Sequence, residues 1–309
     1  MKSIGGFFEL EFGKFESKKE DSIYLNSGRN AIRYLIRALD IKKIHVPSFT
    51  CSAVYEAIKK EKCDLEFYDI GQDLLPKEVL PKEDYIIYNN YFGVTGNKVL
   101  QMAGKYPKLI VDNAQAFYAI SSGRASIYSL RKFFGVPDGG ILTGKEIPAL
   151  QLRKATSYNN VKHLCKRHDK GAEAAYKDYL KNEEKIDKYP LAYCSNLTEA
   201  ILSNIDLEAV KIKRLENFNY LLRYLSTNFP IEMTEGDVPM VFPLLNNQGE
   251  KLRKKLIENR IYCAQYWPNI MECSHKDSYE YYMAQNLVAL PIDQRYNLED
   301  MDRIIRTLK

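Results

Sequence analysis

Lys132 has the surroundings that most clearly predict covalent chemistry in this chain. It lies in SLRKFFGVPDGG, residues 129 to 140, after the strand-like run ASIYSL and before two phenylalanines and a turn of Gly, Pro and Asp. We call residues 129 to 140 the lysine turn. Apolar neighbours on both sides would keep water from the amine, and a desolvated lysine is a nucleophile suited to forming an imine with a carbonyl compound. The lysine turn is therefore a candidate catalytic segment.

Asp112 is a candidate partner for this lysine. It follows three apolar positions in KLIVDNAQA, so we expect it to end a buried strand, where an unpaired carboxylate costs several kcal/mol. Two roles fit: a cap for a following helix, or a counter-charge for a positively charged ligand atom. Gln115, one turn further on, can present its amide to the same ligand.

A phosphate site is indicated where SGRN opens a predicted helix. An anion is attracted here by the hydroxyl of Ser27, by the small Gly28, which lets the backbone approach closely, and by the free backbone N–H groups of the helix N-terminus, where Arg29 lies. A Ser-Gly pair is more often a plain helix cap, so this motif needs support from elsewhere. Ser129 can reach the same phosphate. A phosphate cradle, a carboxylate for a ring nitrogen and a lysine for an imine are the three requirements of pyridoxal 5'-phosphate (PLP).

The elements that must position these residues alternate along the first half of the chain. Helical patterns cover 27 to 39 and 52 to 62, and strand patterns cover 44 to 49, 65 to 70, 85 to 92, 108 to 112, 125 to 130 and 141 to 144. Such alternation predicts an α/β fold with a mostly parallel central sheet and helices on both faces. Ligands of these sheets bind at the carboxyl ends of the strands, where the candidate residues are placed.

The second half differs in character. Residues 146 to 226 are predicted to be mainly helical, and the basic stretch KIKRLENFNYLLRYL at 211 to 225 is interpreted as the solvent-facing side of an amphipathic helix. Strands are then expected at 238 to 245, 261 to 267 and 287 to 292, with helices at 249 to 260 and, capped by Asn297, at 298 to 309. We therefore divide the chain into an N-terminal arm at 1 to 20, a large cofactor-binding domain at 21 to 224 with dimer-forming helices, and a small α+β domain at 225 to 309.

Composition excludes several classes of protein. With 309 residues, 45% of them hydrophobic and 28% charged, the chain should be globular. No apolar run approaches the roughly 18 residues of a membrane span, and the start lacks a signal-peptide pattern, so a cytoplasmic protein without membrane partners is expected.

The six cysteines are widely spaced without a CxxC pair, which favours free thiols and no metal site. The net charge of +5 is scattered, which argues against nucleic acid as a partner and weakly for an anionic small-molecule substrate.

Six motifs, in order, resemble those of the DegT-type (DegT/DnrJ/StrS) sugar aminotransferases, which are PLP enzymes of the aspartate-aminotransferase fold (fold type I). They are SGRNAI, HVPSFTCSAV, FYDI, NNYFG, IVDNAQA and RKFFGVPDGG, and the closing LVALPIDQRYNLEDMDRIIRTL is similar to the last strand and helix of the family. The resemblance covers nearly the whole chain. It implies the fold of that family, PLP as cofactor and a homodimer whose sites lie between two subunits.

The resemblance also implies residue roles. Lys132 forms the imine with the cofactor and moves the proton, and Asp112 keeps the pyridine nitrogen protonated. Gln115 is implied to bind the ring hydroxyl. The residues implied to bind the phosphate are Ser27, Gly28, Arg29 and Ser129. Cys51 stands where the family has a ring-stacking aromatic residue, so Phe49 or Tyr91 is expected to take that part.

Two further departures concern chain geometry. The lysine turn is one residue shorter than the family pattern between Lys132 and its glycine pair, and it contains Pro137, so the turn itself must differ. In the family, an asparagine-containing stretch before the central dimer helix helps to bind cofactor across the dimer, and AYCSNLTEAIL at 192 to 202 has no clear equivalent of it.

The substrate implied by the resemblance is a keto-sugar, mostly nucleotide-linked, aminated from glutamate for surface polysaccharide or a related glycan. The candidate substrate contacts are Arg131, Tyr266 and Trp267, followed by Arg167, His168 and Arg295. Trp267 either stacks on a sugar or base or fills the seam between the domains. Two alternatives stay open: another carbanion enzyme such as a sugar dehydratase, which commonly has histidine at the lysine position, and a non-catalytic relative that keeps only the fold.

Overall fold

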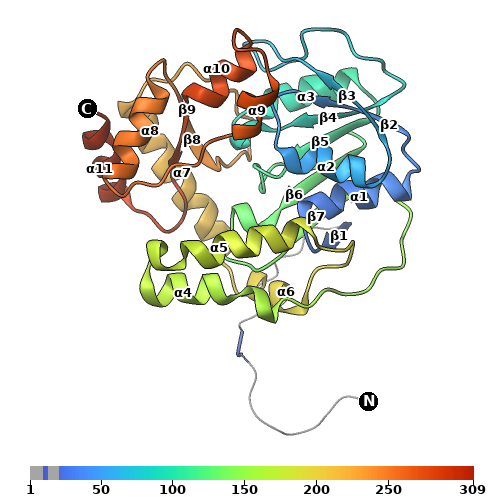
Figure 1. The fold of residues 1–309 in the computed structure, drawn as a ribbon, viewed down its shortest axis with the longest axis horizontal. Helices are drawn as coiled ribbons and strands as arrows, with labels where there is room; N and C mark the ends of the chain where they lie inside the picture. The colour runs from blue at the N-terminus through green and yellow to red at the C-terminus, as the bar shows by residue number, and fades with distance from the viewer. Residues whose placement is uncertain (1–9, 13–20) are drawn as a thin grey trace, which may run out of the picture.

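The computed structural model of the chain describes residues 10 to 12 and 21 to 309. The predicted N-terminal arm, apart from residues 10 to 12, lies outside the described residues. The largest element is a seven-stranded sheet with the order β1-β7-β6-β5-β4-β2-β3 (Figure 1). Its strands are β1 (Ser22–Leu25), β2 (Lys43–Pro47), β3 (Asp64–Tyr68), β4 (Tyr85–Asn89), β5 (Leu109–Asn113), β6 (Ala125–Ser129) and β7 (Gly140–Gly144).

The sheet is mostly parallel, as the sequence predicts. Strands β2 to β6 pair in parallel, and β7 runs antiparallel to both of its neighbours, β6 and β1. Because β7 follows β6 through the lysine turn, a tight reversal there replaces a helical crossover. The lysine turn thus begins at the carboxyl end of β6, at the edge of the sheet where the parallel strands end.

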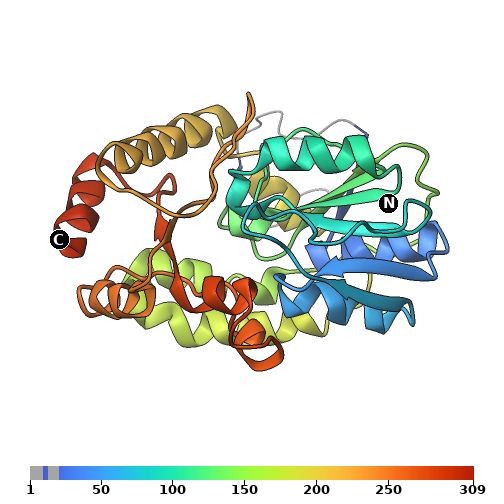
Figure 2. The same ribbon diagram turned by 90° about the horizontal axis from the view of Figure 1, so that it is seen from above.

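Helices cover both faces of the sheet. Along β5, Leu109 and Val111 join one hydrophobic cluster and Ile110 the other, since successive side chains of a strand point to opposite faces. Helices α1 (Gly28–Ala38) and α2 (Ser52–Lys60) cover one face, and α3 (Gly96–Lys105) covers the other (Figure 2). The predicted α/β class with helices on both faces is confirmed.

The region predicted as mainly helical from residue 146 begins later. Its helices are α4 (Lys162–Lys170), α5 (Ala172–Asp187), α6 (Asn196–Leu202) and α7 (Leu207–Tyr224). Residues 146 to 157 contain no helix, because their backbone pairs with the extended chain around Tyr193, which exchanges hydrogen bonds with Arg153 and Ala155. The prediction of helix in that part was wrong.

The C-terminal part is a small α+β unit. Strands β8 (Val241–Leu245) and β9 (Leu287–Pro291) pair antiparallel, and the helices are α8 (Gly249–Glu258), α9 (Pro268–Cys273), α10 (Tyr279–Asn286) and α11 (Leu298–Leu308). Asn297 caps α11 through a capping box with Asp300, as predicted for the cap. The strand predicted at 261 to 267 is wrong: only Ala264 bridges to Ala289, since the chain then turns into α9.

The two parts are tightly joined. One hydrophobic cluster contains core residues of the large sheet together with residues of β8, β9 and α11. Helix α7 packs against α11 and β8, although it precedes the predicted domain boundary at 225. The small unit is therefore held to the sheet by a shared core.

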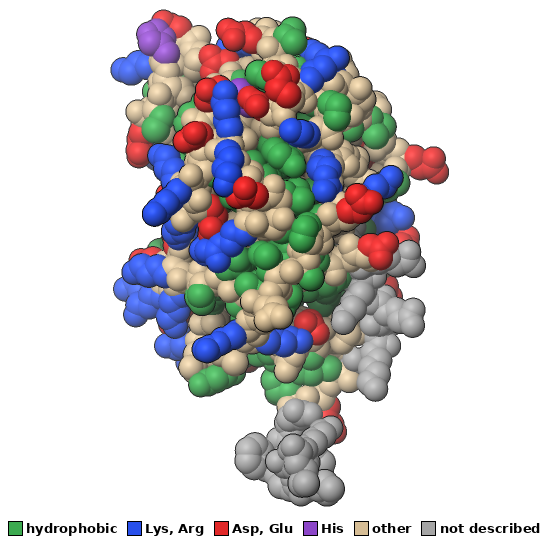
Figure 3. Space-filling view, turned by 90° about the vertical axis from the view of Figure 1, so that its right-hand side faces the viewer, with side chains coloured by type: hydrophobic (Ala, Val, Ile, Leu, Met, Phe, Trp, Pro, Cys, Tyr) green, Lys and Arg blue, Asp and Glu red, His purple; other side chains and the backbone are tan. Residues whose placement is uncertain are grey.

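Other predicted features concern thiols and surfaces. All six cysteines are free. No helix among residues 10 to 12 and 21 to 309 is long and apolar enough to cross a membrane. Within the same residues, no three His, Cys, Asp or Glu side chains gather as metal ligands. The face seen in Figure 3 mixes Lys and Arg with Asp and Glu around apolar side chains.

Candidate active site

Lys132 ends a short 3-10 turn, Leu130–Lys132, at the carboxyl end of β6. Leu130, Phe133 and Phe134 are buried, but Lys132 is exposed. The prediction that apolar neighbours desolvate this amine was wrong, because the 3-10 turn directs those neighbours inward and the lysine outward. Its amine is available to a ligand at the strand ends, and its charge acts on Asp112 there.

The shortness of the lysine turn is explained by the way its second half is anchored. Gly139 has φ +120°, and a Cβ on it would lie 2.6 Å from the Leu130 side chain. A Cβ on Gly140 would lie 2.4 Å from the backbone of Ser27, so β7 starts directly against the start of α1. The Gly139 N–H donates to the backbone carbonyl of Asn26 at 3.1 Å. Two glycines thus let the turn close onto the predicted phosphate segment.

Asp138 fixes the same turn from the other side. Its buried carboxylate accepts the backbone N–H of Ser195 at 3.3 Å, the Ser195 hydroxyl at 3.0 Å and the Thr198 hydroxyl, all at the N-terminus of α6. Burial raises the pKa of Asp138, and these hydrogen bonds oppose that shift. The stretch AYCSNLTEAIL therefore anchors the lysine turn.

We expect Asp138→Asn to lower the free energy of unfolding by about 1–3 kcal/mol, because the amide replaces an acceptor oxygen with a donor facing other donors. Urea unfolding followed by circular dichroism measures this loss. The matched control is Asp277→Asn, since Asp277 is exposed and should change stability by less than about 0.5 kcal/mol. Equal stability of the Asp138 variant and the parent would contradict the anchoring role.

Asp112 lies in β5 at the edge where the parallel strands end, in register with Asn89 of β4 and Ile127 of β6. One carboxylate oxygen accepts the Ala114 N–H at 2.8 Å. No helix follows, so the helix-cap alternative does not apply. Burial raises the pKa of Asp112, while the charge of Lys132 and the Ala114 N–H lower it. A half-buried carboxylate held near a lysine is suited to pair with a cationic ligand atom.

Gln115 has an unsatisfied hydrogen-bond donor. Its side chain is 4% exposed, and its Oε1 accepts the Phe92 N–H at 3.0 Å. Its Nε2 is buried and has no hydrogen-bond partner. Such an orphan donor costs about 1–3 kcal/mol, which a ligand oxygen would recover. The structure thus provides a donor of the kind predicted for the ring hydroxyl.

The predicted phosphate residues come together from two elements. An added Cβ on Gly28 would lie 3.8 Å from the Ser129 Cβ, so the start of α1 and the end of β6 are neighbours. The Ser27 hydroxyl accepts the Asn30 N–H at 3.2 Å and so caps α1. This bond leaves the hydroxyl hydrogen free to be donated to an anion. The cap and phosphate interpretations of Ser27 are therefore compatible.

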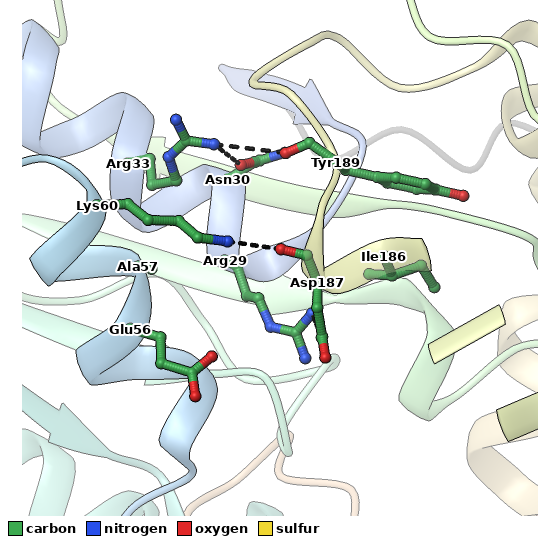
Figure 4. A pocket seen from close by; sticks show the side chains of 9 residues that line it. All are labelled: Arg29, Asn30, Arg33, Glu56, Ala57, Lys60, Ile186, Asp187 and Tyr189. Atoms are coloured by element: carbon green, nitrogen blue, oxygen red, sulfur yellow. Dashed lines mark hydrogen bonds and ion pairs between the residues drawn. The ribbon is translucent and has the colours of Figure 1, made fainter. Parts of the chain in front are cut away.

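The side chain of Arg29 is engaged by protein groups and does not serve a phosphate. Its guanidinium forms an ion pair with Asp187 at the end of α5, and Lys60 Nζ donates to the Asp187 carbonyl at 2.6 Å (Figure 4). The cavity between these residues has a volume of about 10 Å³, room for about one water. Only the backbone N–H of Arg29, in the first turn of α1, remains suited to an anion.

The two aromatic residues expected to stack on a cofactor are closed in by protein. Phe49 and Tyr91 are each 0% exposed, with ring centroids 5.8 Å apart. A ring that stacks on a ligand must present one face to the ligand, so neither can do so in this arrangement. Trp267 packs 4.9 Å from Phe49 and fills the seam between the two parts of the chain. Cys51, half-buried before α2, keeps the position that the resemblance gives to the stacking residue.

The remaining substrate candidates mostly have protein partners. Arg131 pairs with Glu183 of α5, so α5 bonds to two predicted site arginines. Tyr266 is half-buried against Phe92 at 5.2 Å, and burial raises its pKa. Arg167 and His168 are exposed on α4, and Arg295 pairs with Asp293 at 2.6 Å.

Arg214 was misassigned from the sequence. It was included in the solvent-facing side of a helix, but it is only 2% exposed. The signal was present: Val210, Arg214, Phe218 and Leu221 recur at helical spacing, and all are buried. The roles of Asp138 had no such signal, because its partners are far along the chain.

The fold defines a class of known structures. This chain, with its mostly parallel seven-stranded sheet, shares its fold with solved structures of DegT/DnrJ/EryC1/StrS-type sugar aminotransferases, which confirms the predicted fold.

Three solved structures illustrate this similarity. The sugar aminotransferase CalS13 from Micromonospora echinospora is 14% identical, with a TM-score of 0.64 over 94% of this chain and 87% of that one. A DegT DnrJ EryC1 StrS aminotransferase from Brucella abortus is 16% identical, with a TM-score of 0.58 over 93% and 84%. The PLP-form of Spr1654 from Streptococcus pneumoniae is 14% identical, with a TM-score of 0.60 over 93% and 86%. No family model and no curated protein matches the chain.

Proposed function

We propose that this protein is a PLP-dependent aminotransferase. The observation that carries the proposal is one edge of the sheet that combines an exposed lysine, a half-buried aspartate and a buried amide donor without a partner: Lys132, Asp112 and Gln115. These are the groups that an imine, a ring nitrogen and a ring oxygen require. The shared fold with sugar aminotransferases supports the same conclusion.

PLP, when bound, would supply an electron sink that stabilises negative charge at the Cα of an amino acid. Lys132 would hold the cofactor carbonyl carbon and then carry the proton through its amine. Asp112 would keep a proton on the ring nitrogen. The first turn of α1, with Ser27 and Ser129, would bind the phosphate through N–H and hydroxyl donors.

The acceptor that we propose is a keto-sugar, nucleotide-linked, with glutamate as the amino donor, in the synthesis of surface polysaccharide. The sugar aminotransferase CalS13 supports the sugar part of this proposal, since it shares the fold. Tyr266, which is half-buried, is a candidate substrate contact. We also propose a homodimer.

Spectroscopy of the protein with added PLP tests this function. We expect a visible absorbance band on binding, and we expect glutamate to bleach it as the amino group moves to the cofactor. A band that ignores every amino donor would point to another PLP reaction, such as a dehydratase. No band at all would favour a non-catalytic relative that keeps the fold.

A further inference from the structure

Arg214 has the largest of the fully buried side chains in the described part of the chain, and it lies directly behind the lysine turn. It projects from α7, and its guanidinium lies 4.5 Å from the centroid of the Phe133 ring. A guanidinium over an aromatic face at this distance makes a favourable cation–π contact. Phe133 is the residue that follows Lys132.

The hydrogen bonds of Arg214 reach three separate segments. It donates to the Met240 carbonyl at 2.9 Å, to Gln294 Oε1 at 3.1 Å and to the Phe133 carbonyl at 3.5 Å. Gln294 in turn donates from Nε2 to the same Phe133 carbonyl at 2.8 Å. The peptide group between Phe133 and Phe134 is therefore held by two side chains, Arg214 from α7 and Gln294 from the small C-terminal unit.

Burying this guanidinium is costly unless its donors are satisfied. Burial lowers the pKa of Arg214 to about 10, and the negative charge of Asp293 opposes that shift. Because the hydrogen bonds of its guanidinium go to carbonyl and amide oxygens, its chief structural effect is to fix those oxygens, including the one in the lysine turn. An apolar residue of similar volume would fill the space without fixing the turn.

We infer that Arg214, together with Gln294, is a positioning residue that holds the backbone of Phe133 and thereby sets where Lys132 lies relative to Asp112. The catalytic meaning of this inference rests on the proposed function, but its structural content does not. We call the hydrogen bonds of Arg214 and Gln294 to the Phe133 carbonyl the clamp. The N–H groups of Phe133 and Phe134 donate to the Leu130 carbonyl at 3.1 and 2.9 Å, so the exchange of these two amide hydrogens measures whether the clamp holds the turn.

The test compares Arg214→Met and Arg214→Lys with a matched control, Arg253→Met. Arg253 is also buried and also donates to backbone carbonyls, those of Leu287 and Gln285, but on α8, away from the lysine turn. The first readout is amide hydrogen exchange of peptides covering residues 130 to 140, measured without PLP. We expect exchange about tenfold faster in Arg214→Met, intermediate in Arg214→Lys, and unchanged in Arg253→Met.

The second readout is PLP itself, titrated by its visible band. We expect Arg214→Met to bind PLP about tenfold more weakly, equivalent to one lost charged hydrogen bond, and Arg253→Met to bind as the parent does. Unchanged exchange in a folded Arg214→Met protein, or equal changes in the Arg253 control, would overturn the inference. If the parent shows no band, the proposed function fails, and hydrogen exchange still decides the role of Arg214.

Should Arg214→Met not fold, Gln294→Leu tests the same clamp, since Gln294 is only half-buried and donates to the same carbonyl. Faster exchange confined to residues 130 to 140 would support the clamp. Parent-like exchange in this variant would overturn it.

Discussion

Lys132→Ala is expected to abolish the visible band formed with PLP and to reduce amino transfer by about 10³-fold or more, because both the covalent attachment and the proton carrier are lost. Lys132 is exposed, so the free energy of unfolding should change by less than about 0.5 kcal/mol. Absorbance after PLP addition and the rate of glutamate-dependent bleaching measure the loss.

The control for this experiment is Lys251→Ala, since Lys251 is another exposed lysine, on α8. It should keep the band and the rate of the parent. A Lys132→Ala protein that still forms the band and turns over would show that another amine serves the reaction.

Asp112→Asn is expected to have the second largest effect, a fall in amino transfer of about 10²–10³-fold. A neutral amide cannot hold a proton on the ring nitrogen, and the carbanion is then less stabilised. Single-turnover bleaching of the PLP-loaded protein by glutamate measures the fall. A variant that retains more than about a third of the parent rate would contradict the role of Asp112.

The stability of the same variant provides an independent check. Burial raises the pKa of Asp112 in the folded protein, so its contribution to stability is full below the unfolded pKa of about 3.9 and is lost as the pH rises through the folded pKa. At neutral pH, the PLP-free Asp112→Asn protein should therefore be at least as stable as the parent. The two unfolding free energies should approach one another as the pH falls toward 4.

The strand-end residues could be predicted because their signals are local. Asp112 follows an apolar run of the length of a buried strand, and Lys132 lies between a strand and a breaker-rich turn. Parallel pairing brings the ends of such strands to one edge whatever their side chains do. The sequence motifs therefore predicted the edge and the residues on it.

The orientation of the side chains could not be predicted in the same way. Burial of Leu130, Phe133 and Phe134 forces Lys132 outward, which depends on a single 3-10 turn. Arg29 turns to α5, because Asp187 lies there, more than 150 residues further along the chain. Spacing within one motif carries no information about partners at such separations.

Two residues were open to prediction but misinterpreted or left undecided. The helical spacing of Arg214 with buried apolar residues marks the inner face of α7, although its charge suggested the solvent. For Trp267, both a ligand-stacking and a seam-filling position suit a lone tryptophan, and only the packing on Phe49 distinguishes them. In both cases the deciding contact comes from the other part of the chain.

The identity of the lysine that bonds to PLP is the most direct test of this function. The protein is loaded with PLP, reduced with borohydride and digested, and the labelled peptide is identified by mass spectrometry. We expect the label on Lys132 alone, within the segment SLRKFFGVPDGG. Label spread over exposed lysines, or confined to a different one, would contradict a PLP site at the lysine turn.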